Sequence, residues 1–200
     1  MKTILLRILF FGLIPIVVIY LGFQFFNKQN LNSKYTIGQK IDSLNGVYVY
    51  YNGGVGHVLN RNTAPDGYNL GLKYQCVEFV KRYYYQYYHH KMPNSYGHAK
   101  DYYNATLADG ELNKQRNLIQ YLNPSKVKPQ TGDLLVYAGT VSNPYGHVAI
   151  ISKVMDDKIE IIQQNPGAFG DSRVEIGLYK VDKTWKIEND RINCWLRKID

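Results

Sequence analysis

The stretch that follows Pro129 constrains the fold of this chain more than any other feature. It contains five runs rich in β-branched and other apolar residues, and turn residues separate them. The runs cover residues 133–137, 147–154, 158–163, 174–180 and 193–199. Asp156 and Asp157 lie between the second and third runs and indicate a tight hairpin. These patterns predict an antiparallel sheet in the second half of the chain.

A helix is predicted before this sheet. From residue 76 to residue 88, apolar and aromatic side chains recur at helical spacing, with Glu78, Lys81 and Arg82 off that face. Helices early in the chain and strands late in it predict an α+β fold, in which the helix packs on the antiparallel sheet. Three shorter elements are also expected: a strand over residues 47–51 and helices over 99–103 and 112–121.

The N-terminal stretch from Ile8 to Phe26 carries no charged residue. As a helix it would span roughly 28 Å, close to the thickness of a bilayer core. No small-residue cleavage site follows Phe26. We therefore predict one transmembrane helix in a membrane anchor over residues 1–30, and a single domain over residues 31–200. A cleaved signal peptide and a buried helix are the alternatives. The short stub before the helix favours a domain outside the cytoplasm, in the periplasm or at the cell exterior.

The charge and the cysteine count exclude several classes of function. The net charge of +8 comes from scattered lysines without a stripe or motif for nucleic acid, so no nucleic-acid partner is predicted. Two cysteines give no disulfide framework, and Cys194 in a strand-like run is predicted to be a buried core residue. His89, His90 and His98 lack a metal-ligand spacing, so neither a metal nor another cofactor is predicted. The oligomeric state stays open.

Cys76 and His147 are the candidate nucleophile and base. Cys76 opens the predicted helix, where free backbone N–H groups and the helix dipole stabilise a thiolate or an oxyanion. His147 follows Gly146 and begins an apolar strand, and Gln163 and Asn165 lie where the next strand ends. In an antiparallel pair these two ends meet, so a side-chain oxygen there can orient the histidine. Taken singly, such a cysteine is usually a packing residue and such a histidine a structural one.

Three motifs in this order resemble those of the CHAP family, the cysteine, histidine-dependent amidohydrolases/peptidases. Residues 72–82 (LKYQCVEFVKR) resemble its nucleophile motif, residues 146–151 (GHVAII) its histidine motif, and residues 131–137 (TGDLLVY) its Gly-Asp strand. The similarity runs from about residue 37 to residue 196 and is closest to the amidase domain of glutathionylspermidine synthetase/amidase and its trypanothione relatives. It implies a papain-like cysteine hydrolase fold, a thioester intermediate and no metal requirement.

The residues and the resemblance together lead to a mechanistic hypothesis with a role for each residue. Cys76 would be the nucleophile, His147 the base and Gln163 the residue that orients the histidine. Gln75 would help to stabilise the oxyanion, and Asn165 would support the loop. The related amidases carry Glu-Gln-Asn where residues 163–165 read Gln-Gln-Asn. An amide in place of the carboxylate predicts a less complete thiolate–imidazolium pair and a reduced activity.

The leading hypothesis is a membrane-tethered cysteine amidase or endopeptidase. It would cut peptide-like amides outside the cytoplasm, with peptidoglycan as the expected substrate class. One alternative is a glutathionylspermidine-type amidase. A second alternative is a catalytically degenerate wall- or peptide-binding module, which the amide at Gln163 suggests. The expected partners are therefore an amide substrate and the membrane.

Overall fold

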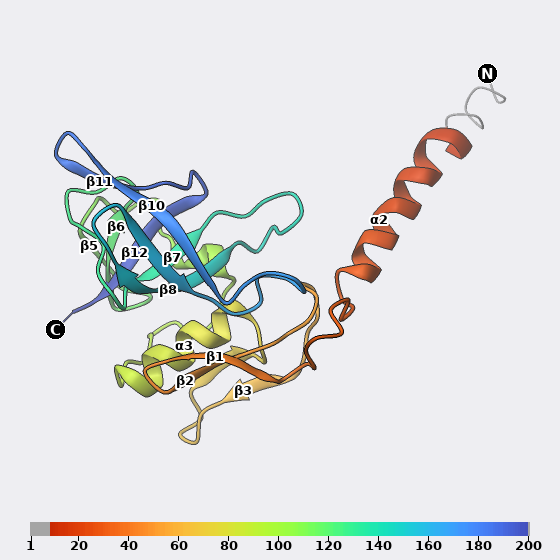
Figure 1. The fold of residues 1–200 in the computed structure, drawn as a ribbon, viewed down its shortest axis with the longest axis horizontal. Coiled ribbons are helices and arrows are strands. Elements are labelled where there is room, and N and C mark those ends of the chain that lie inside the picture. Colours follow the sequence, from red (N-terminus) through yellow and green to blue (C-terminus); the bar gives the residue numbers. More distant parts are fainter. Residues whose placement is uncertain (1–8, 200) are drawn as a thin grey trace.

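An eight-stranded antiparallel sheet dominates the computed structural model, which describes residues 9–199 (Figure 1). Its strands are β5 (Glu111–Asn113), β6 (Leu118–Leu122), β7 (Leu134–Tyr137), β8 (His147–Val154), β9 (Lys158–Ile162), β10 (Arg173–Val181), β11 (Thr184–Ile187) and β12 (Ile192–Lys198). Across the sheet they follow the order β11-β10-β9-β8-β7-β12-β6-β5. The strand that begins with His147 therefore lies inside the sheet, between β7 and β9.

The main helix lies against one face of this sheet. It is α3 (Cys76–Tyr87), and it packs against β8 as well as against two smaller strand pairs (Figure 1). The small pairs are β1 (Lys40–Leu44) with β2 (Val47–Tyr50) and β3 (Arg61–Thr63) with β4 (Asn69–Leu72). A 3₁₀-helix, η2 (Ala99–Tyr102), lies beside β7 and β8. Strands therefore enclose α3 on more than one side.

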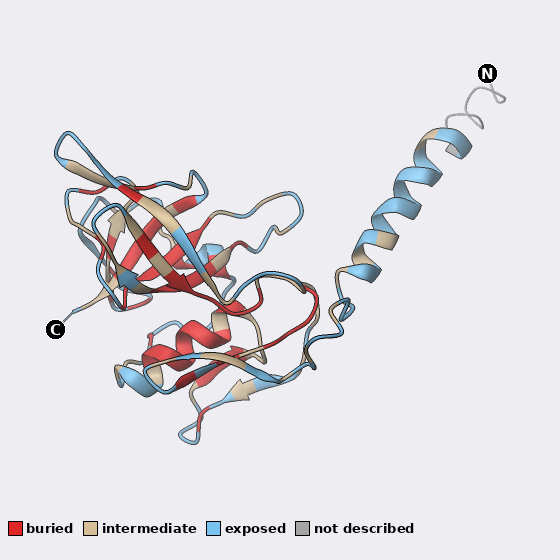
Figure 2. Ribbon diagram, viewed as in Figure 1, coloured by how far each residue is buried: buried red, intermediate tan, exposed pale blue. Residues whose placement is uncertain are grey.

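Both faces of the large sheet are buried near β8. Val148 and Ile150 belong to the apolar cluster on the α3 side, together with Phe79. Ala149 and Ile151 belong to a second cluster on the opposite face. A strand buried on both faces needs a continuous apolar run, which residues 148–151 supply. Figure 2 shows this burial in the inner strands and in α3.

The α+β class and the predicted sheet are confirmed. Strand β8 has the predicted bounds, and α3 ends one residue before its predicted end. Cys194 is fully buried in the core, as predicted, and both cysteines are free thiols.

The helix predicted over residues 112–121 is wrong. This segment forms the hairpin of β5 and β6, and β6 pairs with β12 from the far end of the chain. Asn117 adopts a left-handed backbone with φ of 52° in the turn between the two strands, which an α-helix does not permit. The short helix expected over residues 99–103 is a 3₁₀-helix.

The apolar N-terminal stretch forms a π-helix, Leu9–Leu13, and then α2 (Ile14–Phe26). Helix α2 projects away from the sheets, and most of its apolar side chains are exposed (Figure 2). Among residues 9–199, no helix combines the length and the apolar character that a membrane crossing requires. Ile8, the first residue of the predicted anchor helix, lies outside the described residues.

The segment that follows α2 lies on the folded domain. The carbonyl oxygen of Asn27 accepts a hydrogen bond of 2.9 Å from the backbone N–H of Gly56. The side-chain amide of Asn32 donates one of 2.9 Å to the carbonyl of Ala168. The end of α2 is thereby held beside two loops that also approach the candidate site.

Candidate active site

Cys76 is the first residue of α3, at the position that the sequence predicts. Gln75 before it is extended, with φ of −75° and ψ of 159°, so the helix starts at the cysteine. Cys76 is 8% exposed and belongs to the apolar cluster on the α3 side of the sheet. Burial raises the pKa of the Cys76 thiol to about 11, and the nearby backbone N–H groups, that of Val148 first, oppose this rise. Because Val148 follows His147, the structure brings Cys76 to the start of β8.

His147 is the first residue of β8 and pairs with Tyr137 across the sheet. The two rings are in edge contact, with centroids 5.7 Å apart. Burial lowers the pKa of His147 to about 4, against the opposing hydrogen bond with Gln163 and with a contribution from the positive charge of Arg191. At neutral pH these two shifts favour a thiol and a neutral imidazole over an ion pair.

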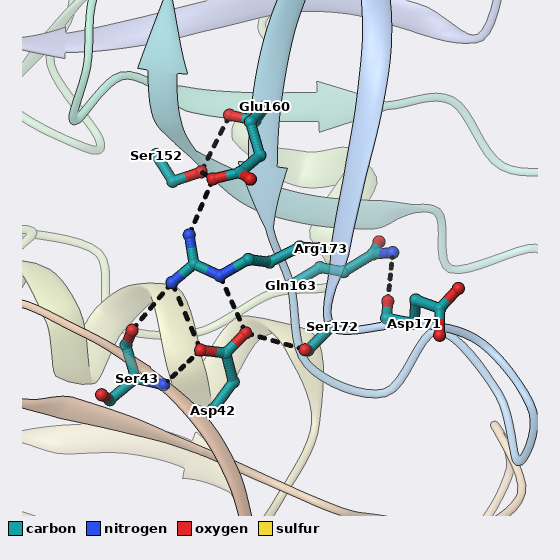
Figure 3. Close-up of polar contacts among 8 residues, drawn as sticks. All are labelled: Asp42, Ser43, Ser152, Glu160, Gln163, Asp171, Ser172 and Arg173. Carbon is teal, nitrogen blue, oxygen red and sulfur yellow. Dashed lines mark hydrogen bonds and ion pairs between the residues drawn. The ribbon is translucent and has the colours of Figure 1, made fainter.

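Gln163 fixes the tautomer of this imidazole. Its amide nitrogen donates a hydrogen bond of 3.0 Å to the carbonyl of Asp171, which can only accept (Figure 3). Its Oε1 atom therefore faces Nε2 of His147, at 2.8 Å. Since Oε1 also only accepts, Nε2 must carry the proton, and Nδ1 keeps a lone pair that can take a proton from a thiol.

The turn that orients Gln163 is itself held by an ion-pair cluster (Figure 3). Arg173 contacts Asp42 of β1 at 3.0 Å and Glu160 of β9 at 2.7 Å. The hydroxyl of Ser172 donates a second bond to Asp42, of 2.8 Å. These contacts join the small β1–β2 pair to the large sheet beside Asp171.

Gln75 and Asn165 form a second chain of amides next to the cysteine. Gln75 donates from its side chain to the carbonyl of His57, at 2.6 Å. Asn165 donates to Oε1 of Gln75 at 2.8 Å and to the carbonyl of Val55 at 3.0 Å. A primary amide has two N–H donors, so Gln75 keeps a second one for an oxyanion.

Sequence reasoning missed a buried polar network behind the nucleophile. Glu78 and Arg82 were expected off the buried face of the helix, yet both are buried and form an ion pair at 2.7 Å. Gln164 donates to Glu78 at 2.9 Å and to the backbone carbonyl of Gln75 at 3.0 Å. Lys81 was also expected off the buried face of the helix, and this is wrong. It is buried because β2 and β4 cover that side of α3. The spacing of four residues between Glu78 and Arg82 was the available signal.

A groove of about 740 Å³ opens beside the histidine. His147, Gln163 and Asn165 line it, and Phe23 and Asn27 contribute from the end of α2. Cys76 is not among the described residues that line the groove. The structure thus brings the five candidate residues to the junction of α3 and β8, and three of them line the groove.

Gly146 sets the backbone before the histidine, which leads to a stability prediction. Its φ is +75°, and an added Cβ would lie 2.6 Å from the carbonyl oxygen of Tyr137. We expect Gly146→Ala to lower the free energy of unfolding by more than about 2 kcal/mol, measured by urea denaturation. Gly67→Ala is the matched control, because Gly67 has a φ of +82° but open space around the added Cβ. Its expected loss is only about 1 kcal/mol. Equal losses of unfolding free energy at the two positions would contradict the explanation by a steric clash with Tyr137.

The resting protonation state predicts how Cys76 reacts with an alkylating agent. With a thiol pKa of about 11, the reactive thiolate fraction grows with pH throughout the neutral range. The rate of alkylation by iodoacetamide should therefore rise about tenfold per pH unit from pH 7 to pH 10, followed by mass spectrometry of the Cys76 peptide. A rate that is already level below pH 8 would show a preformed ion pair instead. Cys194 is the internal control, because its thiol is fully buried and should stay unmodified.

Comparison with known proteins gives two matches. A family model described as "CHAP domain" matches residues 66–165, half of the chain and the part that contains all five candidate residues. The protein named trypanothione synthetase, from Crithidia fasciculata, is 29% identical over 103 residues. That alignment covers 52% of this chain but only 16% of the other protein, so most of the relative has no counterpart in it.

Proposed function

The chain belongs to the CHAP domain family, whose members are amidases or peptidases, and we propose that it hydrolyses peptide-like amides through a thioester on Cys76. The observation that supports this proposal most is the pairing of His147 with Gln163. Because Gln163 holds the proton on Nε2, the Nδ1 atom is free to act as a general base.

In the proposed first half-reaction, Nδ1 of His147 takes the proton of the Cys76 thiol as the sulfur attacks the amide carbonyl carbon. A C–S bond forms, and the carbonyl oxygen becomes an oxyanion. The backbone N–H of Cys76 and the free N–H of Gln75 stabilise that charge. When the intermediate collapses, the C–N bond breaks, and His147 returns its proton to the leaving nitrogen.

The second half-reaction releases the acyl group. Nδ1 takes a proton from water, the hydroxide attacks the thioester carbon, and the C–S bond breaks. The carboxylic acid leaves, and the proton returns to the sulfur of Cys76. Neither step requires a thiolate in the resting enzyme, because proton transfer accompanies each attack. A neutral amide at Gln163 is therefore compatible with turnover.

For the substrate, we propose the peptide bonds of peptidoglycan, outside the cytoplasm. The exposed, apolar surface of α2 supports this choice, because a helix that is apolar on all sides is stable in contact with lipid. The proposal has α2 associate with the membrane and places the groove close to it, where cell-wall precursors and stem peptides are found. The catalytic domain would then act while α2 holds it at the membrane.

Two alternatives have an observation in their favour. The similarity to trypanothione synthetase favours a glutathionylspermidine-type amide as the substrate. The buried thiol, which does not line the groove, favours a peptide-binding module without turnover.

One experiment distinguishes these three functions. The full chain in detergent is incubated with purified peptidoglycan and, separately, with glutathionylspermidine, and the products are identified by mass spectrometry. The proposal predicts a new amine and a new carboxylate from peptidoglycan with the wild type and none with Cys76→Ala. Products from glutathionylspermidine alone would favour the first alternative. No product from either substrate, together with retention of peptidoglycan, would favour the binding module.

A further inference from the structure

The amide chain beside Cys76 leaves one buried acceptor without a partner. Oδ1 of Asn165 makes no hydrogen bond to any described residue, although the side chain is only 7% exposed. An unpaired buried acceptor destabilises the fold, so such atoms usually have a partner in the working state of a protein. Asn165 lines the groove beside His147, so the partner can be a ligand in that groove.

The orientation of this amide follows from its neighbours. The carbonyl of His57 can only accept, so the nitrogen of Gln75 must face it, and Oε1 of Gln75 faces Asn165. Asn165 must then present its nitrogen to Oε1 of Gln75 and to the carbonyl of Val55. Both of its N–H groups are used, and a flipped amide would place an oxygen against two acceptors. Oδ1 is thus fixed as the atom without a partner.

The position of Asn165 indicates which part of a substrate it meets. Its amide lies 2.8 Å from that of Gln75, which flanks the oxyanion in the mechanism above. The leaving amine lies toward His147, which protonates it, so the side of Gln75 belongs to the acyl group. In a peptide the α-nitrogen lies about 2.5 Å from the carbonyl carbon. The α-N–H is therefore the donor of a peptide that lies nearest to the carbonyl carbon on the acyl side.

We propose that Oδ1 of Asn165 accepts a hydrogen bond from the α-N–H of the residue that acylates Cys76. The substrate class is then an acyl donor with a secondary amide or an amine at its α-carbon. Acyl groups with a tertiary nitrogen there should react more slowly. This inference rests on the proposed function and adds a specificity residue to it.

The backbone of Asn165 agrees with such a role. Its φ of 60° lies in the left-handed region, which asparagine tolerates better than most residues with a side chain. That conformation interrupts the extended run after β9 and allows one amide to reach Val55, Gln75 and the groove.

The test uses two chloromethyl ketones that differ in one methyl group, one made from N-acetylglycine and the other from N-acetylsarcosine. Each alkylates Cys76 with loss of chloride, and the thiol proton passes to His147. The measured quantity is the second-order rate of labelling of the Cys76 peptide. For the wild type we expect the N–H probe to react about ten- to a hundredfold faster than the N-methyl probe.

The variants decide whether Asn165 causes this preference. In Asn165→Ala the ratio of the two rates should fall towards one. Asn117→Ala is the matched control, because Asn117 has a similar left-handed φ of 52° on an exposed turn away from the groove. It should keep the wild-type ratio.

Two results would overturn the inference, and only the second would also overturn the proposed function. An undiminished preference in Asn165→Ala would show that Asn165 only supports its loop, and the proposed function would stand. A Cys76 that neither probe labels would refute the proposed function itself, and this inference with it.

Discussion

Cys76→Ala is expected to lower kcat for amide hydrolysis by at least about 10⁴, because no other group in the site can form the thioester. The residual rate would come from binding and from oxyanion stabilisation alone. The measurement is product formation under saturating substrate, with the substrate that the wild type cleaves.

The control separates loss of chemistry from loss of stability. Cys76 is almost fully buried, so the alanine variant also loses packing, at a cost of about 1–2 kcal/mol. Cys194→Ala removes a fully buried thiol from the same apolar cluster and should cost at least as much in urea denaturation. It should keep the wild-type kcat. A Cys76→Ala enzyme as active as Cys194→Ala would contradict the thioester mechanism.

Gln163→Leu is expected to give the second largest loss, up to about 10⁴ in kcat. Leucine removes the acceptor for Nε2–H of His147, so the imidazole can place its proton on Nδ1 and lose its function as a base. The loss in the free energy of unfolding should be much smaller than the increase in activation free energy that corresponds to this loss of kcat. Gln86→Leu, on the exposed side of α3, is the control and should leave both unchanged. A Gln163→Leu enzyme with normal kcat would show that the tautomer is held in another way.

Gln163→Glu tests the contact between residue 163 and His147 through the pH dependence of kcat/KM. In the wild type the imidazole has a pKa lowered to about 4, so it loses its base function only when the pH falls to that range. A carboxylate beside Nε2 stabilises the imidazolium and raises this pKa. The acid limb of the kcat/KM profile should therefore move to higher pH in Gln163→Glu. The substitution also removes the hydrogen bond to the carbonyl of Asp171, so kcat itself should not exceed that of the wild type. An acid limb that stays near pH 4 in this variant would contradict the contact.

Local patterns were enough to predict the elements that carry the chemistry. Strand β8 is apolar on both faces and α3 has a helical repeat of apolar residues. The bounds of both elements can therefore be predicted from the local sequence alone. The hairpin of β5 and β6 was mistaken for a helix because its pairing partner, β12, lies more than 70 residues away. The short strands β1 and β3 are polar, and they exist only through pairing with β2 and β4.

The candidate site was predictable in its residues but not in its protonation state. The order of the motifs is visible in the sequence, and it places Cys76, His147 and Gln163 correctly on the helix start and the strand ends. The hydrogen bond from Gln163 to Asp171 depends on a turn eight residues away, which no local pattern describes. The raised pKa of Cys76 and the lowered pKa of His147 favour a neutral pair over the expected partial thiolate–imidazolium pair, and both shifts depend on tertiary packing.

The most direct test of the proposed function is to trap the acyl-enzyme. The wild-type chain is mixed with the substrate that it cleaves, quenched in acid during turnover, and analysed by intact mass and by peptide mapping. A thioester mechanism predicts a mass increase equal to the acyl part of the substrate, located on the Cys76 peptide and removed by hydroxylamine. Steady product formation with an unmodified Cys76 peptide, in an enzyme that still turns over as Cys76→Ala, would contradict it.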